Sequence, residues 1–163
     1  MIARLIGLAR ARDGNAGLEF ALGAPLLFLA MFGIIELAMI TLVTVLMEGG
    51  LREASRYGIT GYVAAGTTRQ AQIQAIIATD TLGLLDMSKL QITTEVYSSF
   101  SQIGQPGPDP GVAGLGNAGD IVLYRLTYPW PLMTQLMVPI LGTNGIVTLS
   151  ASMAVRNEPY GGP

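Results

Sequence analysis

The chain contains neither cysteine nor histidine, and its 163 residues carry few charged side chains. Without cysteine there can be no disulfide, no thiol catalysis and no cysteine metal site. Without histidine, Ser-His-Asp triads and the usual zinc sites are excluded as well. The remaining polar residues form no nucleophile–base pair in the sequence pattern. We therefore expect no enzymatic activity, no cofactor and no metal site.

Charge is scarce and nearly balanced. Charged residues make up 12% of the chain, whereas about 25% is usual in soluble globular domains. The net charge is −2, and no basic cluster is interleaved with aromatic residues. The electrostatic footprint of a nucleic-acid-binding protein is missing, so nucleic acid is not an expected partner.

The hydrophobic residues are concentrated near the N-terminus. Residues 1–14 form a short basic leader, and an uncharged run from Phe20 to Ile35 follows after Glu19. After Glu36, a second uncharged run extends to Met47. About 20 residues suffice to span a hydrocarbon core of roughly 30 Å. We predict one transmembrane helix over residues 15–47, with part of it projecting beyond the bilayer.

The arginines of the leader determine the expected orientation. Arg4, Arg10 and Arg12 all precede the apolar run. The positive-inside rule then places the N-terminus in the cytoplasm and residues 48–163 on the other side of the membrane. The chain is then a single-pass membrane protein whose folded domain lies outside the cytoplasm.

The rest of the chain predicts a small α+β domain. The long helix should continue to Tyr57 and end in the run Gly58–Gly61, and a second helix should cover Arg69–Ala78. Alternating apolar residues predict three strands of an antiparallel sheet. The expected strands are Leu90–Phe100, Ile121–Tyr128 and Ile146–Arg156, with a Gly/Pro-rich loop over residues 101–119 and prolines that break the chain at Pro129, Pro131 and Pro139.

The junction between leader and apolar run carries a recognisable motif. It reads Gly14-Asn15-Ala16-Gly17-Leu18-Glu19-Phe20, and a carboxylate at the mouth of a membrane segment is costly and therefore seldom accidental. The motif resembles the processing site of bacterial type IV prepilins and pseudopilins. With its short leader and Glu-Phe pair, it is most similar to the TadE-like family of tight-adherence (Flp) pilus proteins.

Three further strings are typical of that family, which makes the resemblance extend over most of the chain except residues 65–120. They are Phe32-Gly33-Ile34-Ile35-Glu36-Leu37, Arg52-Glu53-Ala54-Ser55-Arg56-Tyr57-Gly58 and Arg156-Asn157-Glu158-Pro159. The resemblance also implies the general pilin plan, in which a long helix lies across a small antiparallel sheet.

The resemblance implies a function in pilus assembly. A prepilin peptidase would cut between Gly14 and Asn15, and Glu19 of one subunit would then meet the new Asn15 amine of a neighbour. Such pairing would offset the cost of a carboxylate in a low-dielectric setting. The expected partners are this peptidase, other pilus subunits, the assembly machinery and membrane lipid. The chain would act as a minor pilin or pseudopilin, within or beside an extracellular pilus. The resemblance also implies a bacterial inner-membrane location, with the domain in the periplasm.

Two residues of the membrane segment admit more than one interpretation. Pro25 removes one helix hydrogen bond; it either loosens the helix at a subunit contact or is simply tolerated, as proline often is in membrane helices. Glu36 lies about 25 Å along the helix from Glu19 at 1.5 Å per residue. It is either an acid that reaches to the outer interface or a contact with a partner subunit.

Two other functions remain open at this point. The chain could be an uncleaved single-pass envelope anchor that carries a small binding domain. It could also be a pseudopilin of a type II secretion system, although such proteins usually have a longer uninterrupted apolar run. A cleaved secretory signal is disfavoured, because the apolar run is too long for one.

Overall fold

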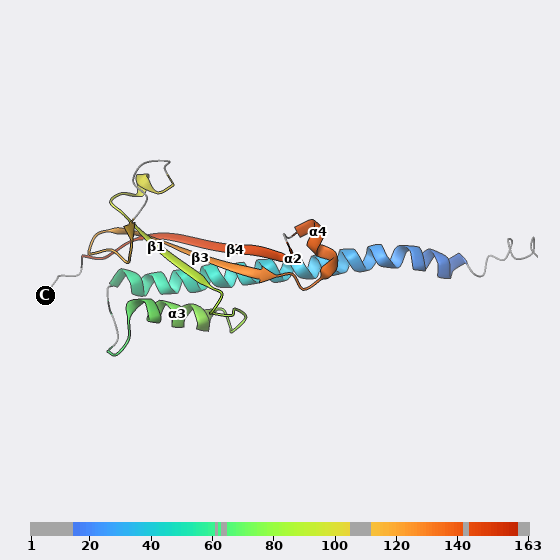
Figure 1. The fold of residues 1–163 in the computed structure, drawn as a ribbon, viewed down its shortest axis with the longest axis horizontal. Helices are drawn as coiled ribbons and strands as arrows, with labels where there is room; N and C mark the ends of the chain where they lie inside the picture. Colours follow the sequence, from blue (N-terminus) through green and yellow to red (C-terminus); the bar gives the residue numbers. More distant parts are fainter. Residues whose placement is uncertain (1–14, 61, 63–64, 105–111, 142–143, 160–163) are drawn as a thin grey trace, which may run out of the picture.

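The computed structural model is built around one long helix with a small sheet along its second half. It describes residues 15–60, 62, 65–104, 112–141 and 144–159. The helix α2 (Asn15–Thr60) extends well beyond the rest of the molecule at its N-terminal end (Figure 1). A shorter helix, α3 (Arg69–Asp80), lies beside its C-terminal part.

α2 forms as the sequence predicts. It is continuous through Pro25 and ends at Thr60, inside the glycine-containing run expected to terminate it. From Ala16 to Ile35 it contains only apolar and small residues apart from Glu19, and these side chains are mostly exposed. Its second half buries Val43, Met47 and Leu51 against the domain. One helix therefore serves both as an exposed apolar rod and as part of a folded core.

The second helix begins and ends with side-chain caps. The Thr68 hydroxyl accepts a hydrogen bond from the Ala71 N–H at 3.2 Å, which satisfies a donor of the first turn. At the other end, the Thr81 hydroxyl donates to the Ile77 carbonyl at 2.7 Å. The predicted helix over Arg69–Ala78 is confirmed and continues two residues further, to Asp80.

The sheet is antiparallel throughout, with strand order β2-β1-β3-β4. Its three main strands confirm the predicted α+β architecture. Their bounds are β1 (Gln91–Tyr97), β3 (Ile121–Pro131) and β4 (Ile146–Arg156). The expected loop over residues 101–119 is interrupted by β2 (Val112–Ala113), which pairs with β1, and by the 3-10 helix η2 (Phe100–Gln102).

β3 continues through two prolines that the sequence suggested would end it. Its pairing with β1 stops at Thr127, while its pairing with β4 continues as far as Pro131 opposite Ile146. Beyond Thr127 the strand has an open side, and proline is tolerated at such edge positions because fewer ladder hydrogen bonds are needed there. The expectation of a break at Pro129 and Pro131 was therefore wrong.

One hydrophobic core joins the sheet to both helices. The inward-facing residues of β3 are the even-numbered ones, including the fully buried Tyr124 and Leu126. β4 contributes Leu149 and Ala151, and α3 contributes Ile73 and Ile77. The residues that α2 adds are Val43, Met47, Leu51 and Ala54.

The connection between β3 and β4 lies at the end of the domain that faces the exposed half of α2 (Figure 1). It contains the 3-10 helix η3 (Gln135–Met137) and one short turn of helix, α4 (Val138–Leu141). It closes with a backbone hydrogen bond from the Leu132 N–H to the Gly145 carbonyl at 2.8 Å. We refer to residues 132–141 as the β3–β4 connection.

Candidate functional site

The exposed half of α2 is the first functional feature. α2 is long and apolar enough to cross a membrane, and only 11% of its most apolar stretch is buried. Phe20, Leu22 and Leu26 are each at least 66% exposed. Because apolar surface of this extent is covered by lipid or protein in a cell, α2 is a candidate membrane anchor by its length and composition.

The predicted processing and assembly residues lie on or before this rod. Glu19, Phe20 and Pro25 all have exposed side chains on α2. Asn15 is the first described residue of the helix, and Gly14 lies outside the described residues. Cleavage after Gly14 and subunit contacts through Glu19 and Pro25 therefore remain predictions.

Glu36 is the second acid of the apolar helix, and the structure surrounds it with hydrogen-bond donors from the same chain. Its side chain is fully buried. The Met133 N–H lies 3.1 and 3.0 Å from the two carboxylate oxygens. The Thr134 N–H and hydroxyl donate to Oε2 at 3.1 and 2.9 Å. Both carboxylate oxygens therefore have donors, supplied by a segment 97 residues further along the chain.

No basic side chain takes part in this arrangement. Among the described residues, the ion pairs are Arg56–Glu53 and Lys89–Asp86, and neither involves Glu36. Hydrogen bonds from N–H and O–H groups to an ionised carboxylate are stronger than those between neutral groups. The Glu36 carboxylate thus fixes the start of the β3–β4 connection to α2, and none of the described residues serves as its counter-ion.

A close contact one turn earlier on α2 supports the same attachment. A methyl group placed on Gly33 would lie 3.3 Å from the Met137 sulfur. Met137 is 5% exposed and is the buried residue of η3. The absence of a side chain at Gly33 therefore lets Met137 pack directly on the helix. Gly33 and Glu36, both within one family-like string, hold one connection in place.

Neither sequence interpretation of Glu36 included this intramolecular role. The interfacial acid and the subunit contact both assumed a partner outside the chain. A buried acid implies nearby donors, but the sequence does not indicate where in the chain they lie. The only feature of the sequence that distinguishes the region of these donors is a long uncharged stretch from Leu126 to Val155, in which Met133 and Thr134 lie.

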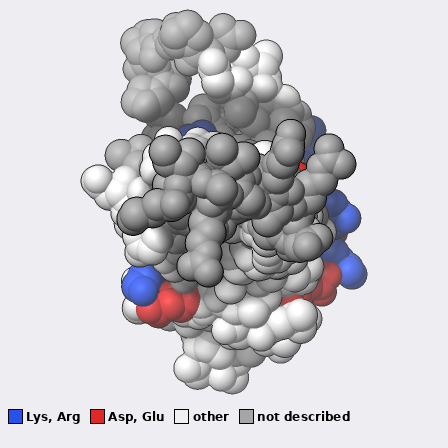
Figure 2. Space-filling model, turned by 90° about the vertical axis from the view of Figure 1, so that its right-hand side faces the viewer, with Lys and Arg blue, Asp and Glu red and all other residues white. Residues whose placement is uncertain are grey.

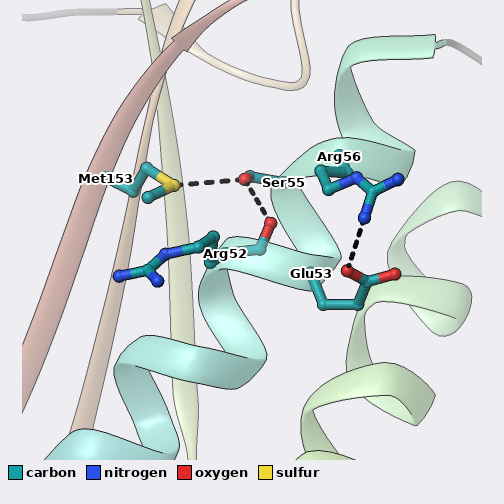
Figure 3. Close-up of polar contacts among 5 residues, drawn as sticks. All are labelled: Arg52, Glu53, Ser55, Arg56 and Met153. Carbon is teal, nitrogen blue, oxygen red and sulfur yellow. Dashed lines mark hydrogen bonds and ion pairs between the residues drawn. The ribbon is translucent and has the colours of Figure 1, made fainter.

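The second family-like string, residues 52–58, packs one side of α2 against the sheet. Ala54 and Ser55 are buried, and the Ser55 hydroxyl donates to the Arg52 carbonyl at 2.8 Å and lies 3.1 Å from the Met153 sulfur (Figure 3). Arg56 Nη1 lies 3.2 Å from Glu53 Oε2, with both side chains substantially exposed (Figure 3). Such an exposed ion pair contributes little to stability.

The last residue of that string makes the tightest approach in the domain. A methyl group on Gly58 would collide with the hydroxyl oxygen of Tyr124, a fully buried residue of β3. Only glycine lets the helix and the central strand come this close. The string therefore has a packing role that explains its glycine.

The third family-like string, residues 156–159, closes the end of the domain opposite to the β3–β4 connection. The buried Asn157 donates through Nδ2 to the carbonyls of Leu115 and Asn117, at 2.9 and 3.0 Å. The next residue, Glu158, donates its N–H to the Ile59 carbonyl at 3.1 Å. The C-terminal string thus joins the last turn of α2, the end of β4 and the turn before β3.

Together these contacts locate the sequence-predicted residues in two regions. Glu19, Phe20 and Pro25 lie on the exposed rod, while Glu36 lies at the point where rod and domain meet. Within the described part of the chain, no cluster of acidic residues has the composition of a metal site. The arrangement is that of an exposed rod whose helix continues into the core of a small domain.

Comparison with known proteins agrees with this description. The model of the family described as TadE-like protein matches residues 14–56, about a quarter of the chain. The match begins at Gly14 and covers the exposed rod, Glu36 and most of the second string. It confirms the TadE-like resemblance and indicates a protein associated with a tight-adherence pilus. No curated protein and no solved structure matches the chain.

Proposed function

We propose that this chain is a minor pilin or pseudopilin that acts in the assembly of a tight-adherence pilus. The observation that carries the proposal is the TadE-like match over residues 14–56, which coincides with an exposed apolar helix attached to a small α+β domain. A prepilin peptidase removes residues 1–14, and the protein then contacts other pilus subunits through α2.

The mechanism is structural and non-catalytic. Cleavage after Gly14 creates a free amine at Asn15, and Glu19 of one subunit pairs with that amine on a neighbour. The exposed apolar side chains of α2 pack against lipid before assembly and against other helices afterwards. The domain lies in the periplasm and selects the partners, since its surface is what other subunits and the machinery meet.

The TadE-like match favours this function over its rivals. An uncleaved envelope anchor would need the exposed rod but would have no use for the motif from Gly14 to Phe20. A type II secretion pseudopilin would use the same processing, but the matching family is associated with the tight-adherence pilus.

Processing by the peptidase tests the proposal directly. Co-expression of the full chain with the cognate prepilin peptidase should shorten it by the 14 leader residues, and N-terminal sequencing should begin at Asn15. Gly14→Val should block the shift, because its β-branched side chain obstructs close approach of the peptidase to the backbone. Gly17→Val is the matched control and should still be cut. A wild-type chain that keeps its leader would leave the uncleaved anchor as the function.

A further inference from the structure

The β3–β4 connection has two sides of different character. On one side, Met137 is buried against α2. On the other, Met133, Leu136 and Ile140 are exposed by 66%, 57% and 64%. Leu136 and Ile140 stand four residues apart in a helical segment, a spacing that places both on the same side. Three large apolar side chains within eight residues form an exposed apolar patch.

The chain on either side of this patch carries no charged residue. From Leu126 to Val155 the sequence contains no charged residue, and α2 contains none between Glu36 and Glu48. Figure 2 shows the molecule from the N-terminal end of α2, with acidic and basic side chains visible at both sides of the outline. By its sequence, the β3–β4 connection itself is suited to an uncharged environment.

The position of the patch along α2 is fixed by Gly33 and Glu36. The segment from Asn15 to Ile35 has 21 residues, which at 1.5 Å per residue gives about 31 Å. This length matches a hydrocarbon core of roughly 30 Å. A bilayer that covers the rod therefore ends where the β3–β4 connection begins. Residues such as Val43 and Met47 lie beyond that level and belong to the domain core.

We propose that the β3–β4 connection is a second membrane contact of this protein. Met133, Leu136 and Ile140 insert into the boundary between headgroups and acyl chains of the leaflet that faces the domain. Glu36 is the positioning residue that holds the connection at this depth. The bilayer-spanning part of α2 is then 15–35, and residues 36–47 are part of the folded domain.

Lipid fits this patch better than a second copy of the chain does. At the level of Glu36, where the connection meets the helix, α2 exposes Ile34, Ile35 and Leu37 by 69%, 48% and 51%. These neighbours belong to the surface that the bilayer covers. Apolar side chains on a short helical segment beside an anchor are typical of interfacial elements, which bury their apolar face at the headgroup boundary. Attachment at two points restricts how far the domain can tilt against the membrane.

This proposal depends on the membrane anchor and not on pilus assembly or leader cleavage. It would hold equally for an uncleaved anchor, so its failure and that of the proposed function are distinguishable. It also does not depend on which side of the membrane the domain occupies.

The absence of cysteine allows a direct test with single-cysteine variants of the full chain. Leu136→Cys and Ile140→Cys would carry a polarity-sensitive fluorophore in nanodiscs that hold one chain each. Phe100→Cys is the matched control, because Phe100 is 54% exposed and its helix η2 lies at the opposite end of the domain (Figure 1). Quenching would be measured with lipids that carry a spin label high on the acyl chain, and with an aqueous quencher.

We expect lipid quenching at positions 136 and 140 to exceed that at position 100 several-fold, with the reverse order for the aqueous quencher. Circular dichroism and thermal unfolding of each labelled variant confirm that the fold is retained. Equal lipid and aqueous quenching at all three positions would overturn the proposal. So would a probe that is shielded from water only when several chains share one disc, since a second copy would then cover the patch.

Discussion

Thr134 donates both its backbone N–H and its hydroxyl to a single oxygen of Glu36, at 3.1 and 2.9 Å. These two hydrogen bonds attach the β3–β4 connection to the middle of α2. The first part of α2 consists of exposed apolar residues over a length sufficient to span a membrane. The relationship makes Glu36 the residue of α2 that holds the start of the β3–β4 connection.

Replacing Glu36 by Leu should loosen this attachment. The substitution introduces an apolar side chain of similar size and leaves the part-buried N–H and O–H donors of Met133 and Thr134 without an acceptor. Each such donor costs about 1–3 kcal/mol when it is not re-solvated. We expect lower thermal stability in detergent micelles and faster hydrogen exchange at the amides of Met133 and Thr134.

Thr134→Val is the control for this experiment. It removes one hydrogen bond of the four contacts to Glu36 and keeps the shape of the side chain, so the expected loss is about 1 kcal/mol. Amide protection in the connection that is the same in Glu36→Leu and in the wild-type protein would show that Glu36 does not hold the connection.

Replacing Gly58 by Ala should destabilise the domain even though alanine is the better helix former. The added methyl group collides with the Tyr124 hydroxyl in a core that has little room to adjust. Overpacking of this kind typically costs about 1–3 kcal/mol. Chemical denaturation of the protein in micelles, followed by circular dichroism, would measure the loss.

The same helix contains a matched glycine for comparison. A methyl group on Gly49 would meet nothing within 4 Å. Gly49→Ala should therefore stabilise the helix by up to about 1 kcal/mol. The double variant Gly58→Ala/Tyr124→Phe, which removes the colliding oxygen, should recover part of the loss. Gly49→Ala and Gly58→Ala variants of equal stability would show that Gly58 makes no special contact.

The sequence was sufficient for those elements whose signal is local. A cap at Thr67 or Thr68 and the stripe formed by Ile73, Ile76 and Ile77 predict α3, and alternation along 146–156 predicts β4; the structure uses Thr68 as the cap. The end of β3 was harder to predict from the sequence. Proline has no backbone N–H, so it interrupts a strand only where a neighbouring strand would accept a hydrogen bond at that position. At Pro129 and Pro131 that depends on where β1 ends, which is a tertiary property.

The candidate site divides in the same way. The unusual acids Glu19 and Glu36 are visible in the sequence because they interrupt an apolar run. The donors to Glu36 are not visible, since Met133 and Thr134 carry ordinary side chains and use mainly their backbone N–H groups. Every backbone offers such groups, so only the folded arrangement of α2 and the β3–β4 connection indicates which ones are used.

Glu19 is expected to matter for assembly more than for folding. Its side chain is exposed on the single chain, and the proposed partner is the Asn15 amine of another subunit. Glu19→Gln keeps the shape and removes the charge. Loss of one hydrogen bond to a charged group, about 1.5–3 kcal/mol, lowers a subunit association constant by roughly tenfold or more. The variant should be made, inserted and cleaved normally, yet cells should carry fewer pili when counted by electron microscopy.

Glu48→Gln, the same change at an exposed acid on the same helix, is the control and should leave pilus number unchanged. Normal piliation with Glu19→Gln would make Glu19 a passive interfacial residue, and loss of the protein itself would make it a structural one.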